Sequence, residues 1–308
     1  MTSFPRAGSP TRHIRTPRAT LALMAAAVLL CIVANLLTLW SALQTPWIGV
    51  SLAPSGASDG LLVRPAPTGP ARPLGAQAVL LDLSTYTASN AIRLQPDDLT
   101  TDPDSFDSYA DVDRFFARQD HIRALLELPV LMNWKDSGGE LHQTIVTPGW
   151  RPLSSLPSSF WNRQAIASLA FLLVVGLWLR GAQDPRRRLL ALAGAAVLLA
   201  VFPASIYGAR ELALSGSTFH MLWALNHAGA TLFGCAIITL LGRYPQPLLG
   251  PRLLLALNLA FLAWLLADLL RVVNNPAWGY RVPLMLQTVL VIGLGTAQWL
   301  MKRRAQER

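Results

Sequence analysis

Six stretches of about 20 mostly apolar residues limit what this chain can fold into, since a helix needs about that length to cross the hydrocarbon core of a bilayer. Hydrophobic residues make up 52% of the chain and charged residues 14%, against about 25% charged residues in a typical soluble domain. The sequence therefore predicts an α-helical integral membrane protein with about six spans and the lipid bilayer as a partner. The predicted spans are residues 19–43, 164–179, 189–207, 218–241, 253–270 and 282–301.

The first apolar run resembles a secretory signal, because Arg12, Arg15 and Arg18 precede it. Its length of about 25 residues exceeds the roughly 7–15 residues of a signal core, and no small-residue cleavage site closes it. We expect an uncleaved anchor helix; removal of the segment is the alternative.

The positive charges alternate along the chain and predict its orientation. Fourteen lysines and arginines lie in residues 1–18, 180–188, 243–252 and 302–308, whereas the short loops between them hold three. Cytoplasmic flanks carry the excess of Lys and Arg. We therefore expect a bacterial inner-membrane protein with cytoplasmic tails at 1–18 and 302–308, a periplasmic segment at 44–163 and a five-helix bundle at 164–301.

The net charge of +9 does not indicate a nucleic-acid partner. Residues 44–163 carry nine basic and thirteen acidic side chains, so the basic excess belongs to one flank of the membrane. Cys31 and Cys235 both lie in apolar runs, so no disulfide framework is expected in the outer segment.

The outer segment shows the pattern of a small α+β domain. Short β-type runs at 47–52, 60–63 and 78–83 precede a helix predicted at 111–128, which Asp111 or Asp113 can cap. A hairpin around Gly138 and Gly139 follows, with strands at 130–134 and 141–146. The acidic residues 97–107 are predicted to form a solvated loop. This order of elements, with residues 60–75 in place of the second strand and its turn, resembles a PDZ-like domain.

Polar side chains inside the spans are the candidate functional residues, because they are costly in hydrocarbon. His220, Trp223 and His227 share one helical face, and Asn226 with His227 forms the deepest polar pair. Two interpretations stay open: a ligand- or pH-responsive pocket at the outer mouth of the bundle, or a structural ion pair between Asp268 and Arg271. The candidates are Arg210, Glu211, His220, Asn226, His227, Asp268 and Arg271.

No residue set predicts catalysis, a metal site or a cofactor. His121 and His142 are isolated, and the acidic run 97–107 lacks the spacing of a calcium loop. Haem would need histidines on facing helices, whereas His220 and His227 lie on one.

Segments 153–161, 184–189, 206–213, 225–233 and 243–245 resemble the membrane input region of proteobacterial sensor histidine kinases that pair with LuxR/NarL-type response regulators. The resemblance implies a signal-input protein. No phosphoacceptor box or nucleotide-binding box is present, so we expect no enzyme activity and a histidine kinase or response-regulator system acting in trans; a homodimer is one arrangement such a chain can adopt. The alternatives are a small-solute transporter or permease, and an envelope assembly or scaffold protein.

Overall fold

The computed structural model describes residues 17–56, 60–74, 77–85, 91–181 and 183–307. Most of the predicted tail 1–18 lies outside the described residues, as do Gly75 and Arg308.

The described residues contain six helices that are long and apolar enough to cross a membrane, which confirms the predicted number of spans and fits an integral membrane protein. Each helix differs from its predicted range by a few residues, because polar residues at the ends continue the helical backbone. Asp184 and Ser215 cap two of them by accepting backbone N–H groups. The helices are α1 (Pro17–Leu43), α3 (Ser158–Leu179), α4 (Pro185–Ala209), α5 (Gly216–Arg243), α6 (Pro251–Leu269) and α7 (Val282–Gln306).

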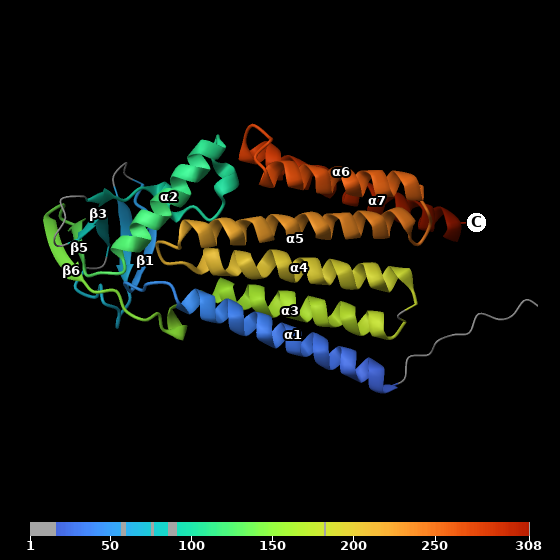
Figure 1. Cartoon of the computed structure of the whole chain (residues 1–308), viewed down its shortest axis with the longest axis horizontal. Helices are drawn as coiled ribbons and strands as arrows, with labels where there is room; N and C mark the ends of the chain where they lie inside the picture. Colours follow the sequence, from blue (N-terminus) through green and yellow to red (C-terminus); the bar gives the residue numbers. More distant parts are fainter. Residues whose placement is uncertain (1–16, 57–59, 75–76, 86–90, 182, 308) are drawn as a thin grey trace, which may run out of the picture.

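Helix α5 lies in the middle of the bundle, with α4, α3 and α1 on one side and α6 and α7 on the other (Figure 1). Gly229 of α5 lies so close to the backbone of Ala200 on α4 that any side chain there would clash. On the other side, Gln287 of α7 donates to the Thr231 carbonyl at 3.1 Å, and Gln298 donates to the Leu241 carbonyl at 2.8 Å. Polar contacts therefore hold α7 against α5.

Residues 44–157 form a separate layer at one end of the bundle, here called the sheet domain (Figure 1). Its antiparallel sheet has the order β1-β2-β3-β5-β6, with the short β4 paired to β3. The predicted first strand begins later than expected, since Trp47 instead forms an isolated bridge with Gly149. The strands are β1 (Val50–Pro54), β2 (Leu61–Pro65), β3 (Ala78–Thr85), β4 (Ile92–Arg93), β5 (Val130–Lys135) and β6 (Leu141–Val146).

Helix α2 (Tyr109–Leu125) of the sheet domain packs between the sheet and the bundle. It begins two residues before its predicted start, because Ser108 rather than Asp111 or Asp113 supplies the cap. Its apolar side chains are divided between two cores: Ile122 packs into the sheet, and Phe116 packs beside Phe219 of α5 with ring centroids 5.6 Å apart. A movement of α2 would therefore change the packing in the core of the sheet domain and against α5.

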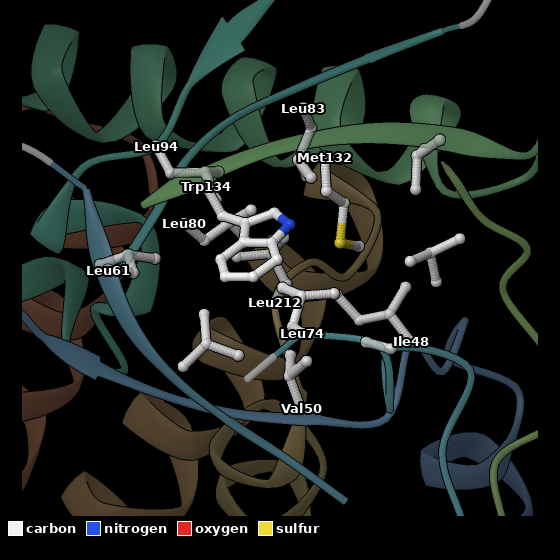
Figure 2. Packing of buried hydrophobic residues seen from close by; sticks show 14 of the residues in the cluster. Ile48, Val50, Leu61, Leu74, Leu80, Leu83, Leu94, Met132, Trp134 and Leu212 are labelled. Atoms are coloured by element: carbon white, nitrogen blue, oxygen red, sulfur yellow. The ribbon is translucent and has the colours of Figure 1, made fainter. Parts of the chain in front are cut away.

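The core of the sheet domain includes residues from the bundle. Leu212 and Ala213, in the loop between α4 and α5, are each 2% exposed and pack among the strand side chains. Figure 2 shows Leu212 between Trp134 and Leu74. The core of the sheet domain is therefore not made by residues 44–157 alone.

The acidic segment is folded against its surroundings, in contrast to the predicted solvated loop. It contains two 3₁₀ turns, η1 (Pro96–Leu99) and η2 (Pro103–Ser105), and the side chains of Asp98 and Asp104 are buried. Arg118 of α2 binds both carboxylate oxygens of Asp98 at 2.5 and 2.9 Å. The polar partners of these acids are far away in sequence, so composition alone favoured a loop.

Candidate functional site

A buried histidine lies between two buried carboxylates where the sheet domain meets the bundle. His227 of α5 has no exposed surface. Its Nε2 lies 3.2 Å from a carboxylate oxygen of Asp104 in η2, and its Nδ1 lies 3.0 Å from Oδ2 of Asp268 on α6. Three segments that are far apart in sequence are thus joined through one ring.

Tyr109, the first residue of α2, extends this chain of contacts. Its hydroxyl donates to Oδ1 of Asp268 at 2.5 Å, and the indole N–H of Trp223 donates to Asp104 at 3.1 Å. We call Asp104, Tyr109, His227 and Asp268 the histidine clamp. Two of its members come from the sheet domain and two from the bundle.

The hydrogen bonds of the clamp constrain where its protons lie. If both carboxylates are ionised, both ring nitrogens of His227 must donate, whereas one protonated carboxyl group would allow a neutral ring. Burial raises the pKa of Asp104, against the opposing effect of its hydrogen bond to His227. Burial and the neighbouring Asp268 raise the pKa of Tyr109, so this phenol stays a donor. The clamp therefore holds two carboxyl groups, an imidazole and a phenol in mutual contact, buried from solvent.

Aromatic rings and a glycine enclose the clamp. The ring of Tyr280 stacks on His227 with centroids 3.5 Å apart and an interplanar angle of 2°, and the Trp223 ring lies 4.2 Å away on another side. Tyr280 belongs to a π-helical turn, Ala277–Arg281, that precedes α7. A Cβ atom at Gly279 would overlap the Asp268 carboxylate, so only glycine fits there.

Two surface ion pairs flank the clamp. Arg271 binds Asp113 of α2 at 2.6 Å, and Arg281 binds Asp102 at 2.5 Å. The predicted ion pair between Asp268 and Arg271 was wrong: Asp268 faces Tyr109 and His227 instead, while Arg271 bonds across the interface. Acids of the sheet domain thus pair with cations of the bundle.

Arg210 and Glu211 lie apart from the clamp, in the loop after α4. Arg210 donates to the carbonyl oxygens of Tyr207 at 2.8 Å and Asp98 at 3.2 Å. Glu211 accepts the backbone N–H groups of Ile48, at 2.7 Å, and Val50. The charged candidate residues are therefore divided between two places at the same end of the bundle.

The remaining predicted residues have supporting positions. His220 lies on the predicted face of α5, but its ring contacts Phe116 and Trp223 at centroid distances of 5.4 and 5.7 Å rather than a carboxylate. Asn226 donates to the Ala200 carbonyl of α4 at 2.9 Å. Both therefore pack the bundle beside the clamp.

Sequence reasoning missed Asp104, Tyr109 and Tyr280 as members or neighbours of the site. The acidic run containing Asp104 was considered only as a cation site or a loop. The one signal in the sequence was the abundance of acids in an outer segment, on the side of the membrane where His220, Asp268 and Arg271 were also predicted.

One group of side chains on the hairpin has the composition of a metal site. Ligand atoms of Asp136, Glu140 and His142 lie within 4.8 Å of one another. Asp136 accepts the N–H groups of Gly138 and Glu140, both at 2.9 Å, and faces His142 Nε2 at 3.1 Å. These hydrogen bonds stabilise the turn between β5 and β6, and they explain why the three side chains lie close together.

Glu211 makes the stability of the chain depend on pH. Burial raises its pKa from 4.5 to about 7, because lost hydration outweighs the N–H groups of Val50 and Ile48 and the charge of Arg151. A carboxyl group that holds its proton more tightly when folded stabilises the fold at low pH, and this contribution is lost as the pH rises through about 7.

We therefore expect the unfolding temperature of the purified chain to decrease as the pH is raised from about 5 to about 7. The Glu211→Gln variant should show a smaller decrease over the same pH range. Glu127→Gln changes an acid that is 65% exposed and serves as the matched control. Equal slopes for both variants would contradict the assignment to Glu211.

Comparison with models of protein families, with curated proteins and with solved structures finds no match to this chain.

Proposed function

We propose that this chain is a membrane-embedded signal-input protein. In this proposal the sheet domain lies in the periplasm as a PDZ-like module, the helices span the bacterial inner membrane, and both termini are cytoplasmic. The asymmetric distribution of Lys and Arg supports the orientation. The resemblance to the input regions of sensor histidine kinases supports a kinase or response regulator as the partner in trans.

The histidine clamp is the observation that carries the proposal. It joins the sheet domain to α5 and α6 through buried hydrogen bonds from Asp104 and Tyr109 to His227 and Asp268. Separating the two parts would leave buried polar groups without partners, which costs several kcal/mol. The interface is therefore suited to two discrete arrangements, docked and undocked, rather than to gradual sliding.

A stimulus acts on such a switch only if it binds the two arrangements with different affinity. A ligand at the interface, or protonation of the clamp, would meet this condition. Helices α5, α6 and α7 meet at the clamp and carry basic residues at their other ends, including Arg243, Arg252 and Arg303. A shift at the clamp would change the surface that these ends present to a cytoplasmic partner.

The test compares Asp104→Asn and Asp268→Asn with the wild-type chain in native membranes. Both variants keep the side-chain shape and remove an ionisable carboxyl group from the clamp, so we expect altered output and altered recovery of the partner after crosslinking and affinity capture, at normal membrane levels. Asp107→Asn, in the same segment but exposed, is the matched control. Failure to recover any kinase or response regulator with the wild-type chain would contradict the proposal.

A polar stripe favours a second candidate, a small-solute transporter or permease. Below His227, α5 continues with Thr231, Cys235 and Thr239 at four-residue spacing. The last two also line a pocket of about 410 Å³ together with Asn258, which donates to Thr239 at 2.8 Å. Uptake of protons or solute by proteoliposomes that contain the purified chain would favour this candidate. Proteoliposomes that take up neither would count against it.

A further inference from the structure

A second pocket, of about 450 Å³, lies between the sheet domain and the bundle, away from the clamp. Its walls come from the start of β1, the end of β2 and the ends of α3 and α4 that face the sheet domain. We call it the arginine pocket after its charged lining residues, which are Arg64, Arg151, Arg210 and Glu211.

In the described part of the chain, none of the three arginines is held in a salt bridge. Arg151 is 7% exposed and donates only to hydroxyl groups, those of Ser155 at 3.1 Å and Thr45 at 3.3 Å. Arg210 donates to backbone carbonyls, and its Nε is buried without a hydrogen-bond partner. Among the residues that the structure describes, no carboxylate lies within 4.0 Å of Arg64, Arg151 or Arg210.

The one acid in the lining, Glu211, forms no salt bridge with these arginines, although its charge acts on Arg151 from a longer distance. Glu211 directs its carboxylate oxygens at the N–H groups of Ile48 and Val50. Burial lowers the pKa of Arg210 to about 10 and also lowers that of Arg151, because the hydration that these guanidinium groups lose outweighs the attraction of Asp98 for Arg210 and of Glu211 for Arg151. An unpaired charge of this kind is costly, and an anion in the pocket would relieve the cost.

Two neighbouring acids of the sheet domain differ from these arginines because they form ion pairs. Asp98 is paired with Arg118, and Asp102 is paired with Arg281 on the clamp side. These acids are thus engaged by Arg118 and Arg281, whereas Arg151 and Arg210 donate to hydroxyl and carbonyl oxygens.

We propose that the arginine pocket binds a small oxyanion, a phosphate or carboxylate group, between the sheet domain and the bundle. Planar guanidinium groups match such oxyanions through paired hydrogen bonds. The apolar part of the lining, including Trp47 and Pro157, leaves room for a short carbon skeleton. The oxyanion is either free in solution or the headgroup of an anionic lipid, because the pocket lies where the helices of the bundle end.

This inference deepens the proposed function by naming a ligand class, and it rests on that function only for the consequence of binding. An anion in the pocket would contact the sheet domain through Arg64 of β2 and the bundle through Arg210 after α4. These are the two parts that the clamp holds together. Binding itself stands on the pocket alone.

The test measures thermal unfolding of the full chain by tryptophan fluorescence. One arm adds sodium phosphate in an uncharged detergent, against sodium chloride at equal ionic strength. The other arm uses nanodiscs of phosphatidylcholine with or without phosphatidylglycerol. We expect saturable stabilisation in at least one arm, and the arm that responds identifies the source of the oxyanion.

Arg64→Ala is the decisive variant, since this exposed arginine can be removed without disturbing a core. We expect it to weaken the apparent affinity about tenfold or more, the usual loss for a hydrogen bond to a charged group. Arg114→Ala, which removes a 76% exposed arginine on α2 outside the pocket, should bind like the wild-type chain.

No saturable stabilisation in either arm, or equal binding by the two variants, would overturn the inference. That outcome would leave the clamp test untouched, because Asp104→Asn and Asp268→Asn change residues outside the pocket. Conversely, binding without any partner in the membrane would support the pocket and contradict the signalling role.

Discussion

Replacement of Asp268 by alanine is expected to release the sheet domain from the bundle at a cost of about 3–5 kcal/mol, the usual loss when one partner of a buried charged pair is removed. Asp268 is 1% exposed and holds both the Tyr109 hydroxyl and Nδ1 of His227. The variant would leave both groups buried without a partner. Loss of stability should appear as a lower thermal midpoint and as faster proteolysis of the connection between β6 and α3, residues 147–157.

Asp113→Ala provides the control for this effect. Asp113 also pairs with the bundle, through Arg271, but its side chain is 51% exposed. Exposed ion pairs contribute about 1 kcal/mol or less, so this variant should remain close to the wild-type chain. Equal losses in Asp113→Ala and Asp268→Ala would mean that the buried clamp does not hold the two parts together.

Gly279→Ala is expected to cost about 3 kcal/mol, at the upper end of the range for overpacking a well-packed site. The added methyl group would overlap the Asp268 carboxylate and lie 2.5 Å from the Tyr109 hydroxyl. Neither group can move away without breaking the clamp. Thermal unfolding should therefore show a lower midpoint, and the fluorescence of Trp223 beside the clamp should change.

The matched control lies on the following helix. A Cβ atom at Gly293 or Gly295 of α7 would meet no atom within 4 Å. Alanine at either position should be neutral or slightly stabilising, because it favours the helix by up to about 1 kcal/mol over glycine. Similar losses at Gly279 and Gly293 would indicate that the cost comes from the helix backbone and not from the clamp.

The helices and strands could be predicted well because their signals are local. A run of apolar residues identifies a span wherever it occurs, and the glycine pair at Gly138 and Gly139 identifies the hairpin without reference to the rest of the chain. The ends of the elements were less accurate. Ser108 caps α2 in place of Asp111, since both residue types can accept a backbone N–H and only the backbone path selects one.

The candidate site was predicted in part. His227 and Asp268 stood out because polar groups are costly inside spans. Asp104 did not stand out because it is one of five aspartates in residues 97–107, and Tyr109 did not because it lies outside the predicted spans. Their role depends on η2 and the start of α2 reaching the mouth of the bundle, and that placement depends on the packing of Phe116 against Phe219.

The six helices, the α+β segment between the first and second of them, and the polar positions inside α5 and α6 could all be predicted from the amino-acid order. Apolar runs, turn residues and charge asymmetry act over short distances, so they can be read without a structure. The pairing of each acid with its basic partner could be known from the tertiary structure alone. The clamp and the arginine pocket both arise from long-range packing that brings Asp104 to His227 and carries the loop with Leu212 into the core of the sheet domain.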